Sequence, residues 1–171
     1  MGLRKILDFK VPREHYQADA IIIWCFDERF DEYRERKPLI RFLFSVLFWI
    51  GMKRFNPETS LLRAYIKQKR FHHPDVIKWA GGAKPLVFEG EGNRNAFRHK
   101  LETAIRLHGA PRIVLMLHAD CGAFNFGDDP SEELENHLAG LCLAGDFLKR
   151  EFPDKEIELL LADFNGLYAL G

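Results

Sequence analysis

The stretch RIVLMLHADCG, residues 112–122, decides the fold. It begins as an almost unbroken apolar run and passes directly into polar residues and a glycine. A continuous apolar run is typical of a strand covered on both faces, as in a parallel sheet, because a half-exposed strand alternates apolar and polar residues. A helix is predicted before it, over 95–108, where apolar residues recur at helical spacing until Gly109 ends the pattern.

Similar segments lie on both sides of this unit. AIIIWC, residues 20–25, is another β-branched apolar run and predicts a second buried strand. Further elements are expected as strands at 74–79 and 157–161 and as a helix at 131–150. Strands that alternate with helices predict an α/β fold with a mainly parallel sheet flanked by helices. The Asn-Gly turn at 165–166 predicts an antiparallel edge strand over 167–170.

Length and charge narrow the class of protein. A chain of 171 residues without repeats or linkers predicts a single domain, 1–171, with one core. Lysine plus arginine number 25 and aspartate plus glutamate also number 25, so the formal net charge is zero. A balanced chain gives no reason to expect a nucleic acid as partner.

The cysteines are few and odd in number. Cys25, Cys121 and Cys142 do not make the even set of a secreted disulfide framework, so we expect reduced thiols and a cytoplasmic protein. The N-terminal residues also lack the apolar run of a signal peptide. Cys142 has leucine on both sides in a predicted helix, which indicates a buried structural thiol.

The segment 38–55 is the most apolar part of the chain. Its uncharged core is too short to span a membrane, which favours a buried or half-buried helix, for example at a subunit interface. Flanking lysines and arginines leave a second interpretation open, a helix lying in the plane of a membrane surface.

Two predicted strand ends carry residues that bind soft metal ions. Cys25 ends the first strand, His118 ends another, and Cys121 follows one turn later. The carboxyl ends of parallel strands lie at one edge of a sheet, so these side chains can meet although they are far apart in sequence. Two thiolates and one imidazole, with a fourth position open, are a catalytic zinc arrangement. Taken singly, His118 and Cys121 would be read as ordinary core residues.

Three short blocks resemble the signature of β-class carbonic anhydrases: CFDER at 25–29, AGG at 80–82 and HADCG at 118–122. The similarity extends over most of 20–29 and 76–170. It does not include 31–70, which the resemblance identifies as a helical insertion within the domain.

The resemblance implies a β-carbonic-anhydrase-like fold and a zinc lyase, a carbonate dehydratase that interconverts CO₂ and bicarbonate. Cys25, His118 and Cys121 would be the zinc ligands, and zinc-bound hydroxide would attack CO₂. Asp27 and Arg29 would form the catalytic dyad, with Arg29 holding Asp27 away from the metal in the active state. In a resting state Asp27 could itself be the fourth zinc ligand. Backbone amides near Gly81 and Gly82 would contact the substrate. The resemblance also implies a homodimer or a higher homo-oligomer.

Two alternatives to this activity stay open. Phe26, Phe124 and Phe126 follow the predicted strand ends and predict an apolar mouth to the site, which would favour carbonyl sulfide or carbon disulfide as the substrate of a hydrolase. The other alternative is a non-catalytic zinc-stabilised module that associates with partners or a membrane through 38–55.

Overall fold

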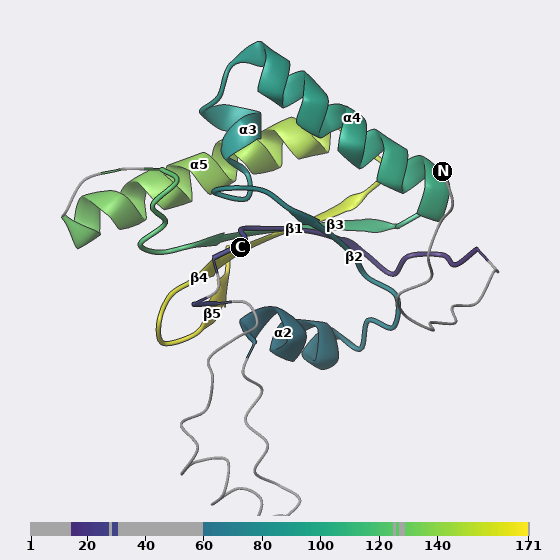
Figure 1. Cartoon of the computed structure of the whole chain (residues 1–171), viewed down its shortest axis with the longest axis horizontal. Helices are drawn as coiled ribbons and strands as arrows, with labels where there is room; N and C mark the ends of the chain where they lie inside the picture. Colours follow the sequence, from purple (N-terminus) through teal and green to yellow (C-terminus); the bar gives the residue numbers. More distant parts are fainter. Residues whose placement is uncertain (1–14, 28, 31–59, 125, 127–128, 171) are drawn as a thin grey trace, which may run out of the picture.

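The computed structural model describes residues 15–27, 29–30, 60–124, 126 and 129–170. Figure 1 shows the arrangement of the elements along the chain. The strands are β1 (Ile21–Trp24), β2 (Asp75–Lys78), β3 (Arg112–His118), β4 (Glu156–Ala162) and β5 (Leu167–Ala169). The helices are α2 (Leu61–Lys69), α3 (Lys84–Val87), α4 (Glu91–His108) and α5 (Pro130–Glu151).

The described strands form one five-stranded sheet in the order β2-β1-β3-β4-β5. All neighbouring pairs are parallel except β4 and β5, which are antiparallel. The mainly parallel sheet and its antiparallel edge strand are both confirmed. β3 lies at the centre, and six of its seven residues are buried, as the unbroken apolar run predicts.

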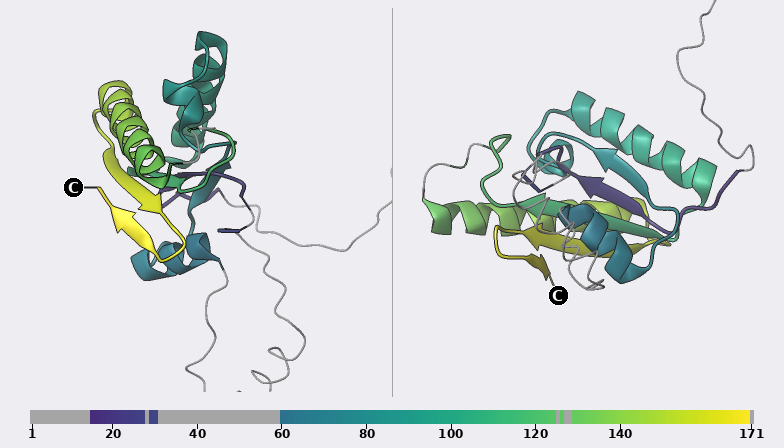
Figure 2. Two further views of the ribbon diagram at one scale, coloured as in Figure 1. Left: turned by 90° about the vertical axis from the view of Figure 1, so that its left-hand side faces the viewer. Right: turned by 60° about the horizontal axis from the view of Figure 1, so that its bottom comes forward.

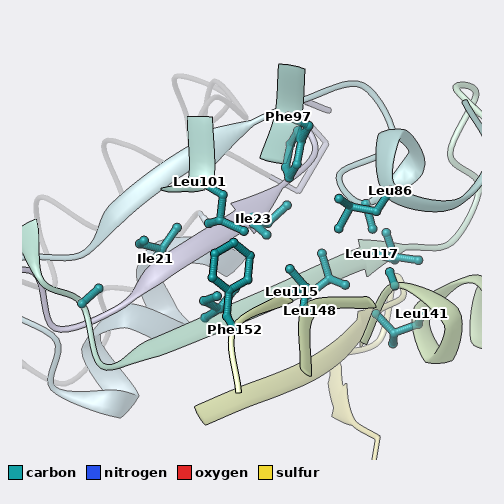
Figure 3. Packing of buried hydrophobic residues seen from close by; sticks show 14 of the residues in the cluster. Ile21, Ile23, Leu86, Phe97, Leu101, Leu115, Leu117, Leu141, Leu148 and Phe152 are labelled. Atoms are coloured by element: carbon teal, nitrogen blue, oxygen red, sulfur yellow. The ribbon is translucent and has the colours of Figure 1, made fainter. Parts of the chain in front are cut away.

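Helices cover both faces of the sheet. α3, α4 and α5 lie on one face, and α2 lies on the other (Figures 1 and 2). Figure 3 shows the larger core, in which Ile21, Ile23 and Leu115 of the sheet pack with side chains from the three helices. A smaller core forms under α2 around Trp24 and Tyr65. The alternating residues of β1 therefore serve two cores, which explains why the whole strand is apolar.

The ends of the long helices follow ordinary capping chemistry. Asp129 caps α5, where its carboxylate accepts a hydrogen bond from the backbone N–H of Ser131 at 2.8 Å. Pro130 occupies the first turn, where a missing N–H costs nothing. Gly109 ends α4 in the left-handed conformation with φ 64°, as its place in the sequence predicts.

The structure differs from the sequence-based expectations in three details. α4 begins at Glu91, four residues before the predicted start, because its first turn is polar and carries no periodic apolar signal. α3 was not predicted, since four residues are too few to show a periodicity.

The prediction of a buried Cys142 is wrong, because this side chain is exposed. The buried residues of α5 include Leu141, Ala144 and Leu148, which follow one another at helical spacing. Cys142 lies about 100° around the helix from Leu141, on the solvent side. Leucines adjacent in sequence are a poor guide to burial within a helix.

The predicted insertion at 31–70 falls mostly outside the described residues, as does the apolar segment 38–55. At the C-terminal end of 31–70, the structure confirms a helix, α2. Ser60 caps this helix, and its side chain accepts a hydrogen bond from the backbone N–H of Arg63 at 3.2 Å. Among the helices that the structure describes, none is both long enough and apolar enough to cross a membrane. Whether 31–70 is an insertion into a single domain stays a prediction.

Truncating the centre of the sheet should destabilise the fold. Leu115 of β3 is fully buried, so we expect Leu115→Ala to lower the free energy of unfolding by about 2–5 kcal/mol. Leu107→Ala on α4 is the matched control, because this side chain is 55% exposed, and its effect should stay within about 0.5 kcal/mol. Urea unfolding followed by circular dichroism measures both, and equal effects would contradict the assigned core.

Candidate metal centre

Three side chains meet at the carboxyl edge of the sheet. Cys25 follows β1, His118 is the last residue of β3, and Cys121 lies in the turn after it. One sulfur or nitrogen atom from each lies within 4.8 Å of the others, and all three residues are buried. Parallel pairing of β1 with β3 produces this arrangement, since it places both strand ends at the same edge. The structure thus brings together the three predicted metal ligands.

The donor set fits a zinc ion. Two sulfurs bound tetrahedrally at zinc's usual bond length would lie about 3.8 Å apart, and the sulfurs of Cys25 and Cys121 lie 4.0 Å apart. The Nδ1–H of His118 donates to the carbonyl of Ala119 at 2.9 Å, which leaves the lone pair on Nε2. That Nε2 is buried and has no hydrogen-bond partner among the described residues. Sulfur and imidazole donors favour zinc over magnesium or calcium.

The two thiols differ in acidity because they face each other. A hydrogen bond from Cys121 lowers the pKa of Cys25 to about 4, and the nearby imidazole of His118 and the N–H of Gly81 act in the same direction. The same hydrogen bond and burial raise the pKa of Cys121. Burial disfavours the charged form of His118, but Cys25, the carbonyl of Ala119 and Asp27 together outweigh this effect and raise its pKa. A metal ion bound by both sulfurs would displace any proton that they hold.

The glycine pair lies against this site. Gly81 and Gly82 have φ values of 69° and 54°, in the left-handed region that glycine adopts without the steric cost of a Cβ. A Cβ on Gly82 would lie 2.9 Å from the carbonyl oxygen of Met116 and 3.6 Å from the backbone nitrogen of Cys25. The backbone N–H of Gly82 donates a hydrogen bond to the carbonyl oxygen of Trp79 at 2.8 Å. The pair therefore lets the turn after β2 approach the ends of β1 and β3.

Asp27 and Arg29 form an ion pair beside the three buried residues. Arg29 Nε lies 3.0 Å from Asp27 Oδ1, and Nη2 lies 2.6 Å from Oδ2. Hydrogen bonds from Arg29 lower the pKa of Asp27, and the same bonds raise the pKa of Arg29. Asp27 Oδ2 lies 3.9 Å from the Nε2 of His118. The charged carboxylate of Asp27 is thus held next to the Nε2 lone pair of His118, which faces the candidate metal site.

Asp120 is a second partner of Arg29 that sequence analysis missed. Its side chain accepts a hydrogen bond from Nη1, and its carbonyl accepts one from Nη2 at 2.6 Å. Arg29 therefore joins the loop after β1 to the loop after β3. The only sequence signal was position, since Asp120 stands between His118 and Cys121.

Aromatic rings surround the outer side of the site. The ring of Phe30 lies 4.8 Å from that of His118, and the ring of Phe164 lies 5.3 Å from Phe30. Phe26 and Phe164 are 62% and 65% exposed. Phe124 packs against Gly81, and Phe124 and Phe126 both pack against His137 of α5. Phe26 is exposed, and its part in an apolar mouth stays a prediction. Phe30 and Phe164 were not predicted, because nothing local in sequence indicates where they point.

Comparison with known proteins identifies the fold. No family model matches the chain, and no curated protein matches it in sequence. Its structure is similar to that of a tetrameric β-carbonic anhydrase from the filamentous ascomycete Sordaria macrospora, with a TM-score of 0.52 and 14% sequence identity. The match covers 91% of this chain and 82% of that chain. The chain has the β-carbonic anhydrase fold.

A carbonic anhydrase from Glaciozyma antarctica is also similar, with a TM-score of 0.49 and 16% identity over 92% of this chain and 84% of that chain. At 14% identity, the similarity to the Sordaria protein shows the fold alone. The fold expected from the three sequence blocks is confirmed, and the chemistry rests on the residues described above.

Removing the guanidinium should change the acidity of Asp27. We expect Arg29→Gln to raise the pKa of Asp27 toward its ordinary value near 4. The lowered pKa makes Asp27 stabilise the fold above about pH 4, and this contribution is lost as pH falls through the folded-state pKa. The variant should therefore lose less stability on acidification. Carboxyl-carbon NMR titration measures the pKa directly.

Asp154 supplies the internal control for this titration. Its pKa is lowered by Lys155, in the turn between α5 and β4, and should be the same in both proteins. An Asp27 titration that does not move in Arg29→Gln would contradict the ion pair.

Proposed function

We propose that the protein is a zinc-dependent lyase, a carbonate dehydratase that interconverts CO₂ and bicarbonate. The observation that carries this proposal is the buried group of Cys25, His118 and Cys121 with a carboxylate–guanidinium pair beside it. A purely structural zinc site needs four ligands and gains nothing from Asp27 and Arg29. The β-carbonic anhydrase fold supports the assignment, because it is a scaffold on which this chemistry occurs.

The three buried residues would hold the zinc ion. Cys25 and Cys121 would bind as thiolates and His118 through Nε2, since its Nδ1–H is already committed to Ala119. When bound, zinc lowers the pKa of water and so supplies a nucleophile at neutral pH. Burial of all three residues keeps competing ligands away.

Asp27 would orient the reacting water. Its low pKa keeps it ionised at neutral pH, so it accepts a hydrogen bond and never donates one. Arg29 fixes the direction of the carboxylate through two hydrogen bonds. With Asp27 accepting a hydrogen bond from the reacting water, a lone pair of the water oxygen would point toward the carbon of CO₂. The proton released by the reaction would pass to buffer.

Other predictions about the site and the protein stay proposals. Backbone amides near Gly81 and Gly82 would contact the substrate, although the N–H groups of these two glycines already have partners in Cys25 and Trp79. A homodimer or a higher homo-oligomer is supported by the tetrameric state of the Sordaria protein. Membrane contact through 38–55 and a cytoplasmic location stay predictions.

Carbonyl sulfide or carbon disulfide is the second candidate substrate. The exposed rings of Phe26 and Phe164 and the ring of Phe30 over His118 favour it. Both compounds have an electrophilic carbon between two heavy atoms, as CO₂ has, but they are less polar. Attack by water would require the same zinc ligands and the same carboxylate.

Metal analysis combined with one substitution tests the proposal. We expect the purified protein to contain stoichiometric zinc and to hydrate CO₂ in a stopped-flow indicator assay. Asp27→Asn should keep its zinc and lose about 10²–10⁴-fold in turnover, since it loses a positioned proton acceptor. Asp154→Asn, a change of the same kind at an exposed surface position, should leave turnover unchanged.

The other outcomes of these assays distinguish between the alternative functions. Turnover of carbonyl sulfide or carbon disulfide without CO₂ hydration would favour the hydrolase. Zinc without turnover of any of the three substrates would favour the non-catalytic module. A protein that binds no zinc would contradict the proposal altogether.

A further inference from the structure

Asp120 has a backbone conformation that needs support. Its φ is 52°, in the left-handed region, which is unfavourable for a residue that carries a Cβ. It lies two residues after His118 and directly before Cys121, so its conformation sets how these two side chains face each other. Whatever holds Asp120 in this state also shapes the metal site.

Glu133 provides that support from α5. Its Oε1 accepts a hydrogen bond from the backbone N–H of Asp120 at 2.6 Å. Arg29 holds the side chain and the carbonyl of the same residue. Asp120 is therefore held at three points, by Arg29 from the loop after β1 and by Glu133 from the helix α5.

The position of Glu133 is fixed in turn by His137, one helical turn later. His137 Nε2 lies 3.2 Å from the same Oε1, and its side chain is 1% exposed. The rings of Phe124 and Phe126 stand nearly perpendicular to the imidazole, each with its centroid 5.0 Å away. The loop after β3 and the side chain of Glu133 therefore both contact the imidazole and limit its rotation.

The buried imidazole acts as a donor. Burial lowers the pKa of His137, so the neutral ring donates its Nε2–H to Glu133. Its Nδ1 is buried and has no hydrogen-bond partner among the described residues. A buried polar atom left unpaired is unfavourable. A phenylalanine would avoid that penalty, which indicates that the Nε2 bond has a use.

We propose that Glu133, fixed by His137, is a positioning residue of the metal site. It holds Asp120 in the left-handed conformation, so that His118 and Cys121 face the same ion and Asp120 faces Arg29. This inference rests on the proposed zinc site, but it does not depend on which substrate the protein converts.

Zinc affinity tests the inference, measured by competition with a chromophoric chelator under reducing conditions. Loss of a partner that orients metal ligands typically weakens metal binding by about 10–100-fold. We expect a loss of that size in Glu133→Ala. The visible absorption of the cobalt-substituted protein should change as well, because it reports the coordination geometry. A substitution that merely destabilised the fold would leave this spectrum unchanged.

Two further variants serve as rescue and control. Glu133→Gln should bind zinc nearly as tightly as the wild type, because both hydrogen bonds use Oε1, an oxygen that glutamine keeps. Glu132→Ala removes a carboxylate from the same helical turn, but its side chain is exposed, so affinity and spectrum should be unchanged. His137→Phe fills the space between the rings without a donor and should weaken zinc binding by less than Glu133→Ala.

Wild-type affinity and spectrum in Glu133→Ala would overturn the inference. If that variant does not fold, His137→Phe decides, with reduced affinity in favour and unchanged affinity against. A wild-type chain that binds no zinc would overturn the metal site and this inference together. A wild-type chain that binds zinc but does not convert CO₂ would overturn only the carbonate dehydratase, and the comparison among variants would still stand.

Discussion

Parallel pairing of β1 with β3 is the constraint on which the rest of the site depends. Ile23 pairs with Leu115, and continuing this register by two residues brings Cys25 level with Leu117, one residue before His118. The apolar side chains of both strands are buried in cores on the two faces of the sheet. A shift of one strand by one residue would move its apolar side chains to the opposite faces of the sheet. It would also separate the sulfur of Cys25 from the imidazole of His118. The hydrophobic pattern therefore fixes the chemistry as well as the fold.

Ion pairs then hold together the loops that follow β1 and β3. Arg29 lies between the carboxylates of Asp27 and Asp120, so one guanidinium joins the ends of two strands. Arginine suits this place because its planar donors can bind two partners at once, whereas a lysine would act as a single point charge. Glu133 continues the network into α5, so the centre is coupled to a helix on the face opposite α2.

The sequence was informative where a signal is local and uninformative where it depends on tertiary geometry. Cys25 and His118 could be predicted because each ends an apolar run, with Cys121 one turn after His118, and strand ends in a parallel sheet share one edge. The hydrogen bonds of Asp120 and Glu133 could not be predicted, since they depend on how α5 lies against the loop after β3. The wrong prediction for Cys142 has the same origin, because burial follows the face of the helix. The segment 38–55 lies outside the described residues, and its two interpretations stay open.

The exposure of Cys142 has a practical consequence. Two of the three cysteine thiols, those of Cys25 and Cys121, are buried at the metal site, and the third, that of Cys142, is exposed on α5. A bulky thiol-reactive dye will therefore reach a single position in the native protein, without mutagenesis. Fluorescence from that label would report tumbling and self-association while the interior sulfurs stay unmodified.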